Sequence, residues 1–170
     1  MNLDSKIMIT GANGMVGRSL VKKLKKEGYN NLLTPSSKEL DLKNQNDVEK
    51  YFKENKPNYV FHLAAKVGGI AANIESPANF LHDNLIMQSN VIEFARKYKV
   101  EILLFLGSSC IYPKNSPQPM KEEYVLTGKL EPTNEGYGIS KIAGLKMCQY
   151  YNKQHGTNFI SLMPCNLYGP

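Results

Sequence analysis

The sequence alternates short apolar runs with segments of helical periodicity, and this alternation constrains the fold more than any other feature. Five runs have apolar residues too continuous for a half-exposed strand: residues 6–10, 31–34, 59–63, 101–106 and 158–163. Four segments between them are predicted to be helical: residues 15–27, 47–55, 77–99 and 134–155. In residues 77–99, we expect one apolar stripe formed by Leu81, Leu85, Ile92 and Ala95. Such strands separated by helices predict an α/β fold, a Rossmann-like doubly wound parallel sheet with helices on both faces.

Length and composition fit one globular domain. A chain of 170 residues with 42% hydrophobic residues can bury one substantial core. No stretch is long and apolar enough to span a membrane, and the first six residues do not resemble a signal peptide. The three cysteines, Cys110, Cys148 and Cys165, lack metal-ligand spacing, so we expect no metal site and a reducing, cytoplasmic setting.

The net charge of +6 allows two interpretations. It fits an anionic ligand such as a dinucleotide or a nucleotide-sugar. It also fits solvation alone, because four lysines lie on one predicted amphipathic helix: Lys22, Lys23, Lys25 and Lys26. The basic residues are not interleaved with exposed aromatic residues and no recognition motif is present, so nucleic acid is not an expected partner.

A glycine run follows the first predicted strand and opens the first predicted helix. It reads Gly11-Ala12-Asn13-Gly14-Met15-Val16-Gly17. In this context Gly11 permits a tight turn, Gly14 lets the backbone approach a pyrophosphate, and Gly17 allows close packing of helix and sheet. The helix N-terminus then offers unpaired N–H groups to the phosphates. The run therefore predicts a dinucleotide site, although glycine runs also occur as ordinary turns.

The end of the second predicted strand indicates which dinucleotide binds. An acidic residue there would hold the ribose 2′-hydroxyl of NAD, whereas this chain has Thr34-Pro35-Ser36-Ser37-Lys38. Because hydroxyl groups and a lysine suit a 2′-phosphate, we expect the cofactor to be NADP(H). Asp41 comes later and is expected to face the adenine, or else to form a helix N-cap or a turn.

Tyr137 and Lys141 are four residues apart in a predicted helix, so their side chains share one face. A phenol has a pKa of about 10, and a nearby ammonium group is expected to lower the pKa of Tyr137. Tyr137 can then donate a proton to a carbonyl oxygen as hydride reaches the carbon. Ser108, at the end of the fourth predicted strand, is the expected third member and hydrogen-bonds the same oxygen, or else it caps a turn.

Cys110 follows Ser108 by two residues, at the sheet edge where ligands bind in this fold. Its thiolate could abstract a proton beside a ketone, or the residue could be a small buried hydrophobe. The other two cysteines have no such support. We expect His62, in a strand, to belong to the core or to support a site residue, and we expect His82 and His155 at the surface.

These residues resemble the extended short-chain dehydrogenase/reductase family over essentially the whole chain. Four strings are similar to those of its bifunctional nucleotide-sugar epimerase–reductases: Leu63-Ala64-Ala65-Lys66-Val67-Gly68-Gly69-Ile70, Phe105-Leu106-Gly107-Ser108-Ser109-Cys110-Ile111-Tyr112-Pro113, Leu130-Glu131-Pro132-Thr133-Asn134-Glu135 and Pro164-Cys165-Asn166-Leu167-Tyr168-Gly169-Pro170. The strings around Cys110 and Val67 are more specific than the general family signature.

The resemblance implies an NADPH-dependent enzyme that converts GDP-4-keto-6-deoxy-D-mannose to GDP-L-fucose. Cys110 would be the base that epimerises C3 and C5, because the C4 ketone acidifies both neighbouring carbons, and Tyr137 would be the acid in the C4 reduction. Lys141 would tune Tyr137 and bind the cofactor ribose, and Ser108 would contact the carbonyl. Cofactor contacts are implied at Gly11, Ala12, Asn13, Gly14, Met15, Val16, Gly17, Ser37, Lys38, Asp41, Leu42, Leu63, Ala64, Ala65, Leu106, Gly107, Ser108, Ser109, Lys141, Pro164, Cys165, Asn166 and Leu167.

The chain also departs from the family pattern. An arginine often occupies the position of Ser37, and a basic residue can occur at Asn13, so the preference for NADP is weakened. The chain ends before the family's catalytic histidine and its small C-terminal substrate domain. We therefore expect residues 1–170 to be a truncated dinucleotide-binding domain that binds cofactor weakly and does not turn over unless completed. The family often forms a homodimer through long helices, here residues 77–99 and 134–155.

Two other functions stay open from the sequence. One is a different nucleotide-sugar epimerase or dehydratase that keeps NAD bound, and a requirement for Cys110 would distinguish it from the epimerase–reductase. The other is a non-catalytic dinucleotide-binding module, such as a redox sensor or a scaffold. The presence of Ser108, Tyr137 and Lys141 together argues against that module.

Overall fold

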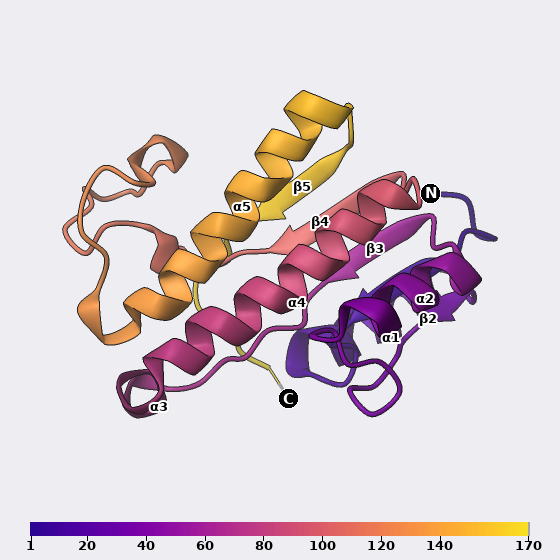
Figure 1. Ribbon diagram of the computed structural model, residues 1–170, viewed down its shortest axis with the longest axis horizontal. Helices are drawn as coiled ribbons and strands as arrows, with labels where there is room; N and C mark the ends of the chain where they lie inside the picture. The colour runs from indigo at the N-terminus through magenta and orange to yellow at the C-terminus, as the bar shows by residue number, and fades with distance from the viewer. Residues whose placement is uncertain (170) are drawn as a thin grey trace.

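A parallel sheet of five strands forms the centre of the computed structural model, which describes residues 1–169 (Figure 1). The strands are β1 (Ile7–Thr10), β2 (Leu32–Leu33), β3 (Tyr59–His62), β4 (Ile102–Leu106) and β5 (Phe159–Leu162), in the spatial order β2-β1-β3-β4-β5. Every neighbouring pair is parallel, which confirms the predicted doubly wound sheet. Pro170, at the end of the fourth family-like string, lies outside the described residues.

Four long helices connect the strands, and each agrees with its predicted bounds to within two residues. They are α1 (Met15–Lys26), α2 (Gln45–Asn55), α4 (Pro77–Lys97) and α5 (Glu135–His155). The α2 helix begins earlier than predicted because the side chain of Asn44 accepts the backbone N–H groups of Asn46 and Asp47. In α4, Pro77 occupies the first turn, where its missing N–H group is not needed.

Shorter elements were not predicted. The helix α3 (Ile70–Glu75) has only six residues, too few for a periodic pattern. The segment at residues 112–133, predicted as an extended loop, contains the 3₁₀ turn η2 (Glu122–Tyr124) and leads into η3 (Pro132–Asn134). A third turn, η1 (Ser109–Ile111), follows β4 directly.

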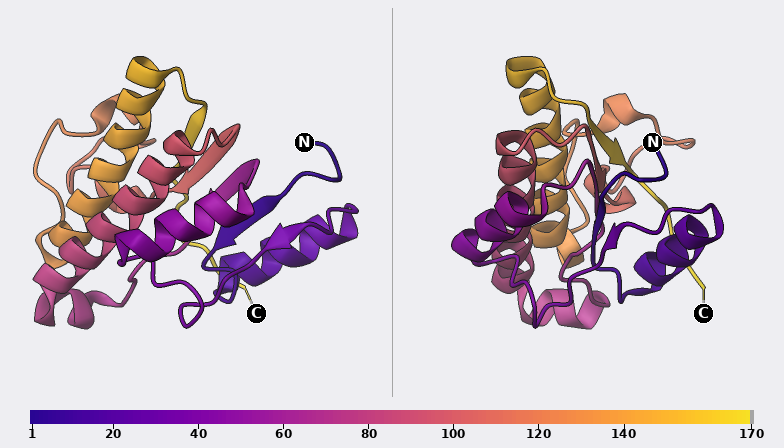
Figure 2. Two further views of the ribbon diagram at one scale, coloured as in Figure 1. Left: turned by 45° about the vertical axis from the view of Figure 1, so that its right-hand side comes forward. Right: turned by 90° about the vertical axis from the view of Figure 1, so that its right-hand side faces the viewer.

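The helices form layers on both faces of the sheet, as predicted. Figure 2 shows α2, α4 and α5 on one side and α1 on the other, and Figure 1 shows α4 and α5 lying side by side. The larger core lies beneath α2, α4 and α5 and includes the fully buried Phe52 and Phe105. The smaller core lies between the sheet and α1 and includes Ile7, Ile9 and Leu24.

The apolar stripe predicted for α4 needs a correction. Ile92 and Ala95 are buried as expected, but Leu81 and Leu85 are only half-buried. Nearer the start of the helix, the polar residues Asn84 and Gln88 are buried instead, because they pair with backbone groups that would otherwise be unsatisfied. The Asn84 amide donates to the Lys66 carbonyl and accepts the Lys66 N–H, and Gln88 Nε2 donates to the Ser140 carbonyl at 2.6 Å.

The sheet is open at β5. Among residues 1–169, this strand pairs with β4 alone, and Ile160 and Leu162 on it are 42% and 47% exposed. Membrane insertion of a helix finds no support in the described part of the chain, where none is both long and apolar enough to cross a bilayer.

The strand order fixes where a ligand can enter. The chain passes from β1 to β2 on one side and returns to β3 on the other, so the connections after β1 and β3 diverge. In open parallel sheets, ligands bind at this point, outside the carboxyl ends of the strands.

Candidate functional site

The glycine run turns from the end of β1 into α1, and two of its positions require glycine. Gly11 has φ of +73°, and a Cβ there would lie 2.8 Å from the backbone nitrogen of Ala64. A Cβ at Gly17 would lie 2.2 Å from the carbonyl oxygen of Gly11. The loop is therefore pressed against both the start of its own helix and the end of β3.

The N-terminus of α1 is prepared for an anion. Its N-cap residue, Gly14, has no side-chain capping bond, and the first turn holds no acidic residue. The N–H groups of the first turn thus carry the positive end of the helix dipole with no side chain to neutralise them. A pyrophosphate fits this cradle, because Gly14 has no side chain to block its approach.

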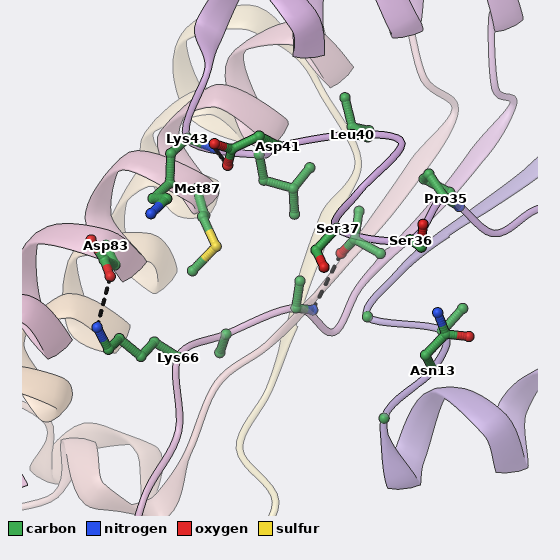
Figure 3. A pocket seen from close by; sticks show the side chains of 17 residues that line it. Asn13, Pro35, Ser36, Ser37, Leu40, Asp41, Lys43, Lys66, Asp83 and Met87 are labelled. Atoms are coloured by element: carbon green, nitrogen blue, oxygen red, sulfur yellow. Dashed lines mark hydrogen bonds and ion pairs between the residues drawn. The ribbon is translucent and has the colours of Figure 1, made fainter. Parts of the chain in front are cut away.

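A cavity of about 400 Å³ lies on the β2 side of the glycine run. Figure 3 shows it with Asn13 and Ser36 on one side and Met87, Asp83 and Lys66 on the other. The Lys66 ammonium pairs with the Asp83 carboxylate at 2.9 Å, and this hydrogen bond lowers the pKa of Asp83. The cavity is lined by Thr10, Gly11, Ala12, Asn13, Gly14, Pro35, Ser36, Ser37, Leu40, Asp41, Leu42, Lys43, Ala64, Ala65, Lys66, Asp83 and Met87.

A second cavity, of about 680 Å³, lies on the β4 side. It shares Gly11, Gly14, Ala64 and Ala65 with the first, so the two cavities meet at the glycine run and form one crevice. It is lined by Gly11, Gly14, Met15, Val16, Gly17, Leu63, Ala64, Ala65, Val67, Gly68, Leu106, Gly107, Ser108, Tyr137, Pro164, Cys165, Asn166 and Leu167.

Nearly all the residues expected at a cofactor site line this crevice. The exceptions are Lys38, which is exposed, Ser109, which begins η1, and Lys141, which is buried. Several other residues that line the crevice were not predicted from the sequence: Thr10, Pro35, Ser36, Leu40, Lys43, Lys66, Val67, Gly68, Asp83 and Met87. The spacing of Asp83 and Met87, four residues apart on α4, is the signal that would have placed both on one face.

A third cavity, of about 360 Å³, is lined by three basic side chains. It is lined by Ala12, Asn13, Arg18, Val21, Lys22, Lys25 and Thr34. It shares Ala12 and Asn13 with the first cavity, and Arg18 Nη1 donates to the Asn13 carbonyl at 3.3 Å. The ion pairs within residues 1–169 use neither Arg18, Lys22 nor Lys25, whereas Lys23 on the same helix pairs with Glu27.

The structure brings Ser108, Tyr137 and Lys141 together at the carboxyl end of β4. Ser108 and Tyr137 line the second cavity, and Lys141 lies one helical turn beyond Tyr137 with its Nζ 5.8 Å from the centre of the Tyr137 ring. The Ser108 hydroxyl caps η1 by accepting the Cys110 N–H at 3.3 Å, so the turn-capping role foreseen for it is real and leaves its own hydrogen free to donate.

The expected lowering of the Tyr137 pKa is not found. Burial raises the pKa of Tyr137, a hydrogen bond with Ser108 opposes that rise, and the charge of Cys110 adds to it. Lys141 does not offset the burial, because its ammonium group donates to the Leu106 carbonyl at 2.8 Å and lies 4.9 Å from the Phe105 ring centre. Burial also lowers the pKa of Lys141, to about 8. This arrangement favours a protonated phenol, which is the form that donates a proton.

His62 belongs to the core, as expected. It is fully buried at the end of β3, its Nδ1 lies 2.8 Å from Thr10 Oγ1, and its ring stacks on Phe105. Burial lowers the pKa of His62 to about 3, with a smaller contribution from the charge of Lys141. The imidazole is therefore neutral and supports the wall between β1 and β3. His82 and His155 are exposed, as expected.

The three cysteines differ in their surroundings. Cys148 is a buried residue of α5, Cys165 is exposed, and Cys110 is half-buried in η1 with its Sγ 3.3 Å from Asn134 Nδ2. Cys110 does not line the second cavity but lies two residues beyond Ser108, which does. No cluster of three His, Cys, Asp or Glu side chains suited to a metal ion occurs in the described residues.

The site can therefore hold an elongated anionic ligand along the crevice and present a phenol and a hydroxyl at one end of it, with the Cys110 thiol two residues beyond the hydroxyl. The anion-binding helix end lies between the two cavities. Comparisons with known proteins agree with this geometry. A family model described as the NAD dependent epimerase/dehydratase family matches residues 7–170.

Similar proteins include GDP-L-fucose synthase 1 of Arabidopsis thaliana, which is 55% identical over 98% of this chain and 52% of its own length. A GDP-mannoheptose C4 reductase from Campylobacter jejuni with NADP bound is 48% identical, with a TM-score of 0.97, over 99% of this chain and 54% of the other. A GDP-L-fucose synthetase from Naegleria fowleri bound to NADP is 29% identical, with a TM-score of 0.91, over 100% of this chain and 53% of the other. The chain spans about half the length of the curated relatives it matches.

Proposed function

Because this chain belongs to the NAD dependent epimerase/dehydratase family, we propose that it acts in the NADPH-dependent conversion of GDP-4-keto-6-deoxy-D-mannose to GDP-L-fucose. In this proposal residues 1–170 are the dinucleotide-binding domain. One observation carries it: a single cavity is lined by the glycine run, by Ser108 and by Tyr137. The name of the Arabidopsis relative, GDP-L-fucose synthase 1, supports the substrate.

The reduction of C4 rests on three residues of this chain. NADPH, when bound, supplies hydride. Tyr137 donates its phenolic proton to the C4 oxygen, and Ser108 donates a hydrogen bond to the same oxygen. Lys141 donates to the Leu106 carbonyl, with its Nζ 5.8 Å from the centre of the Tyr137 ring, and so holds the end of β4 from which Ser108 follows.

The epimerisation rests on Cys110. The C4 ketone acidifies the C–H bonds at C3 and C5, so a thiolate can remove a proton there and a proton can be returned on the opposite face. Cys110 is half-buried and close enough to Tyr137 that its charge raises the pKa of that phenol. We assign Cys110 as this base, beside the acid of the reduction.

NADP rather than NAD is supported by the positively charged cavity. The third cavity lies at the end of β2, where the adenosine ribose is held in this fold, and offers Arg18, Lys22 and Lys25 to a 2′-phosphate. These cations come from α1, so they replace the arginine that the family often has at the position of Ser37. Lys38, which the sequence favoured for this role, lines neither this cavity nor the crevice.

The test follows two signals from one substrate. NADPH oxidation reports reduction, and deuterium incorporation at C3 and C5 in heavy water reports epimerisation. The assay is run on this chain and on the chain extended by the half of the Arabidopsis relative that it does not match. Tyr137→Phe is expected to slow reduction by about 100-fold or more while exchange persists, and Cys110→Ser is expected to abolish exchange. The absence of both signals from the extended wild-type chain, or unchanged reduction in its Tyr137→Phe variant, would contradict the proposal.

A second candidate is reduction of a GDP-4-keto-heptose without epimerisation. It is favoured by the likeness to the GDP-mannoheptose C4 reductase of Campylobacter jejuni, at 48% identity and a TM-score of 0.97. The same assay separates the two functions, because a pure C4 reductase consumes NADPH with no deuterium exchange at C3 or C5.

We also propose that the protein is a cytoplasmic homodimer that pairs through α4 and α5. Ile139 and Tyr150 lie on one exposed face of α5 and are 43% and 62% exposed, which suits contact with a second copy. The free cysteines suit a reducing compartment. Sedimentation of wild type against Ile139→Glu tests the pairing, and fractionation of cells tests the location.

A further inference from the structure

Asn134 occupies the N-cap position of α5 but does not cap the helix. Asparagine is favoured at this position because its side-chain oxygen accepts a backbone N–H of the first turn. In α5 no side-chain capping bond is formed. Asn44, the N-cap of α2, shows the usual behaviour and accepts two backbone N–H groups. Something other than capping therefore determines how the Asn134 side chain lies.

The Asn134 side chain is directed to a sulfur atom. Its Nδ2 donates to Cys110 Sγ at 3.3 Å. Its Oδ1 is buried without a hydrogen-bond partner, one of two such side-chain atoms among residues 1–169. A thiolate can only accept hydrogen bonds, so the amide nitrogen is the end of the side chain that must face it. Leaving Oδ1 buried without a partner and leaving the helix uncapped both raise the free energy of the folded state. The side chain nevertheless adopts this orientation, which indicates that its hydrogen bond to Cys110 determines it.

One close backbone contact and two hydrogen bonds to side-chain oxygens hold this pair in place. A Cβ at Gly138 would lie 2.8 Å from the Cys110 carbonyl oxygen, so the first turn of α5 is pressed directly on η1. Ser108 accepts the Cys110 N–H at 3.3 Å. Glu131 accepts the N–H of Thr133 at 3.3 Å and fixes the turn that leads into Asn134.

Several charged and titratable groups lie near Cys110 and Asn134. From α5 they are Tyr137, whose hydroxyl bonds Ser108, and the buried Lys141, which is directed to Leu106. On the approach to α5, the Glu131 carboxylate pairs with Lys114 at 2.9 Å. Within the described residues, neither Lys141 nor Lys114 donates a hydrogen bond to the thiol. The Asn134 amide is therefore its donor.

We propose that Asn134 is a positioning residue for the Cys110 thiolate. Its amide N–H stabilises the negative sulfur and holds Sγ in one place, so that the thiolate can accept a proton from carbon and become a thiol. The inference rests on the proposed function for the role of Cys110, but the contact itself can be tested without cofactor or sugar.

The test measures alkylation of Cys110 by iodoacetamide across the pH range, read by mass spectrometry of the Cys110 peptide. Asn134→Asp is the decisive variant, because aspartate is an equally good N-cap but cannot donate to the sulfur and repels its charge. We expect the midpoint of the alkylation profile to move up by at least one pH unit, which is about tenfold slower alkylation near neutral pH. Asn134→Ala is expected to shift it in the same direction by less.

Two controls keep the result specific. Cys165 is exposed and is alkylated in the same sample, so its rate should not change. Asn44→Asp replaces an N-cap that does cap its helix and should leave the Cys110 profile unchanged. If Asn134→Asp and Asn134→Ala keep the helical circular dichroism of wild type and also keep its Cys110 profile, the proposal is wrong. Failure of the epimerase–reductase assay with a shifted profile would instead contradict the proposed function alone.

Discussion

The ammonium group of Lys141 donates a hydrogen bond of 2.8 Å to the carbonyl oxygen of Leu106, the last residue of β4. This bond ties α5 to the strand that leads into Ser108 and η1. Burial lowers the pKa of Lys141 from 10.5 to about 8, so the folded protein holds this charge less readily than the unfolded chain does.

The lowered pKa of Lys141 predicts how stability depends on pH. Between about pH 8 and 10.5 the unfolded chain binds more protons at this lysine than the folded one. The free energy of unfolding therefore rises with pH in this window, by up to about 1.4 kcal/mol per unit from this group. Urea unfolding of wild type and Lys141→Met, near pH 7.5 and near pH 10, should show wild type gaining about 2 to 3 kcal/mol relative to the variant. Parallel pH profiles would contradict the burial of the charge.

His62 is expected to make the free energy of unfolding depend on pH at the acid end of the range. Its pKa is lowered from 6.5 to about 3, so its contribution to stability is complete above pH 6.5 and is lost as the pH falls toward 3. The loss is up to about 1.4 kcal/mol for each pH unit. His62→Gln should have a flatter acid-unfolding profile than wild type. The exposed His82, replaced by Gln, is the control and should keep the wild-type slope.

Arg18 is predicted to select NADPH over NADH. Because a charge-assisted hydrogen bond to phosphate is lost, Arg18→Ala should weaken NADPH binding by about tenfold and leave NADH binding unchanged. Calorimetric titration with both cofactors measures the difference. Lys26→Ala, on the same helix but outside the charged cavity, is the matched control. An equal loss of affinity for NADPH and NADH, or no loss for either, would show that the 2′-phosphate does not bind in this cavity.

Alanine substitutions at two glycines of the loop should have different effects on stability and on dinucleotide binding. A Cβ at Gly17 would lie 2.2 Å from the Gly11 oxygen, so Gly17→Ala should lower the free energy of unfolding by about 2 kcal/mol or more. A Cβ at Gly14 would lie 3.3 Å from the same oxygen, so Gly14→Ala should cost less than about 1 kcal/mol. Gly14→Ala should nevertheless lose most of its dinucleotide affinity, because the methyl group occupies the phosphate cradle. Thermal unfolding and calorimetry together separate the two effects.

The sequence was sufficient for the sheet and the long helices because their signals are local. Apolar runs, helical spacing and the residues at helix ends place β1, α1, α4 and α5 to within two residues. The same local signals could not reveal α3, which is too short to show a period. They also misplaced the buried face of α4, because Asn84 and Gln88 are buried by partners on other segments.

Most residues predicted for the candidate site line the crevice, but the electrostatics of the site were not predicted. Glycine spacing identifies residues of the crevice wall, and the Tyr137–Lys141 interval places the buried Lys141 one helical turn from Tyr137, which lines the crevice. The sign of the Tyr137 pKa shift depends on burial and on where the Lys141 ammonium is directed, and neither is written in the interval between two residues. The cluster of Arg18 with Thr34 likewise joins α1 to the end of β2, which only the folded chain reveals.

The unpaired edge of β5 is expected to promote aggregation when the protein is heated or concentrated. One edge of this strand presents free backbone hydrogen-bonding groups in the described chain, and Ile160 and Leu162 on it are exposed. Edges of this kind are templates for adding strands from other molecules. Heating or concentrating this chain is therefore expected to produce β-rich aggregates that start at β5, and a charged residue in place of Ile160 should delay them.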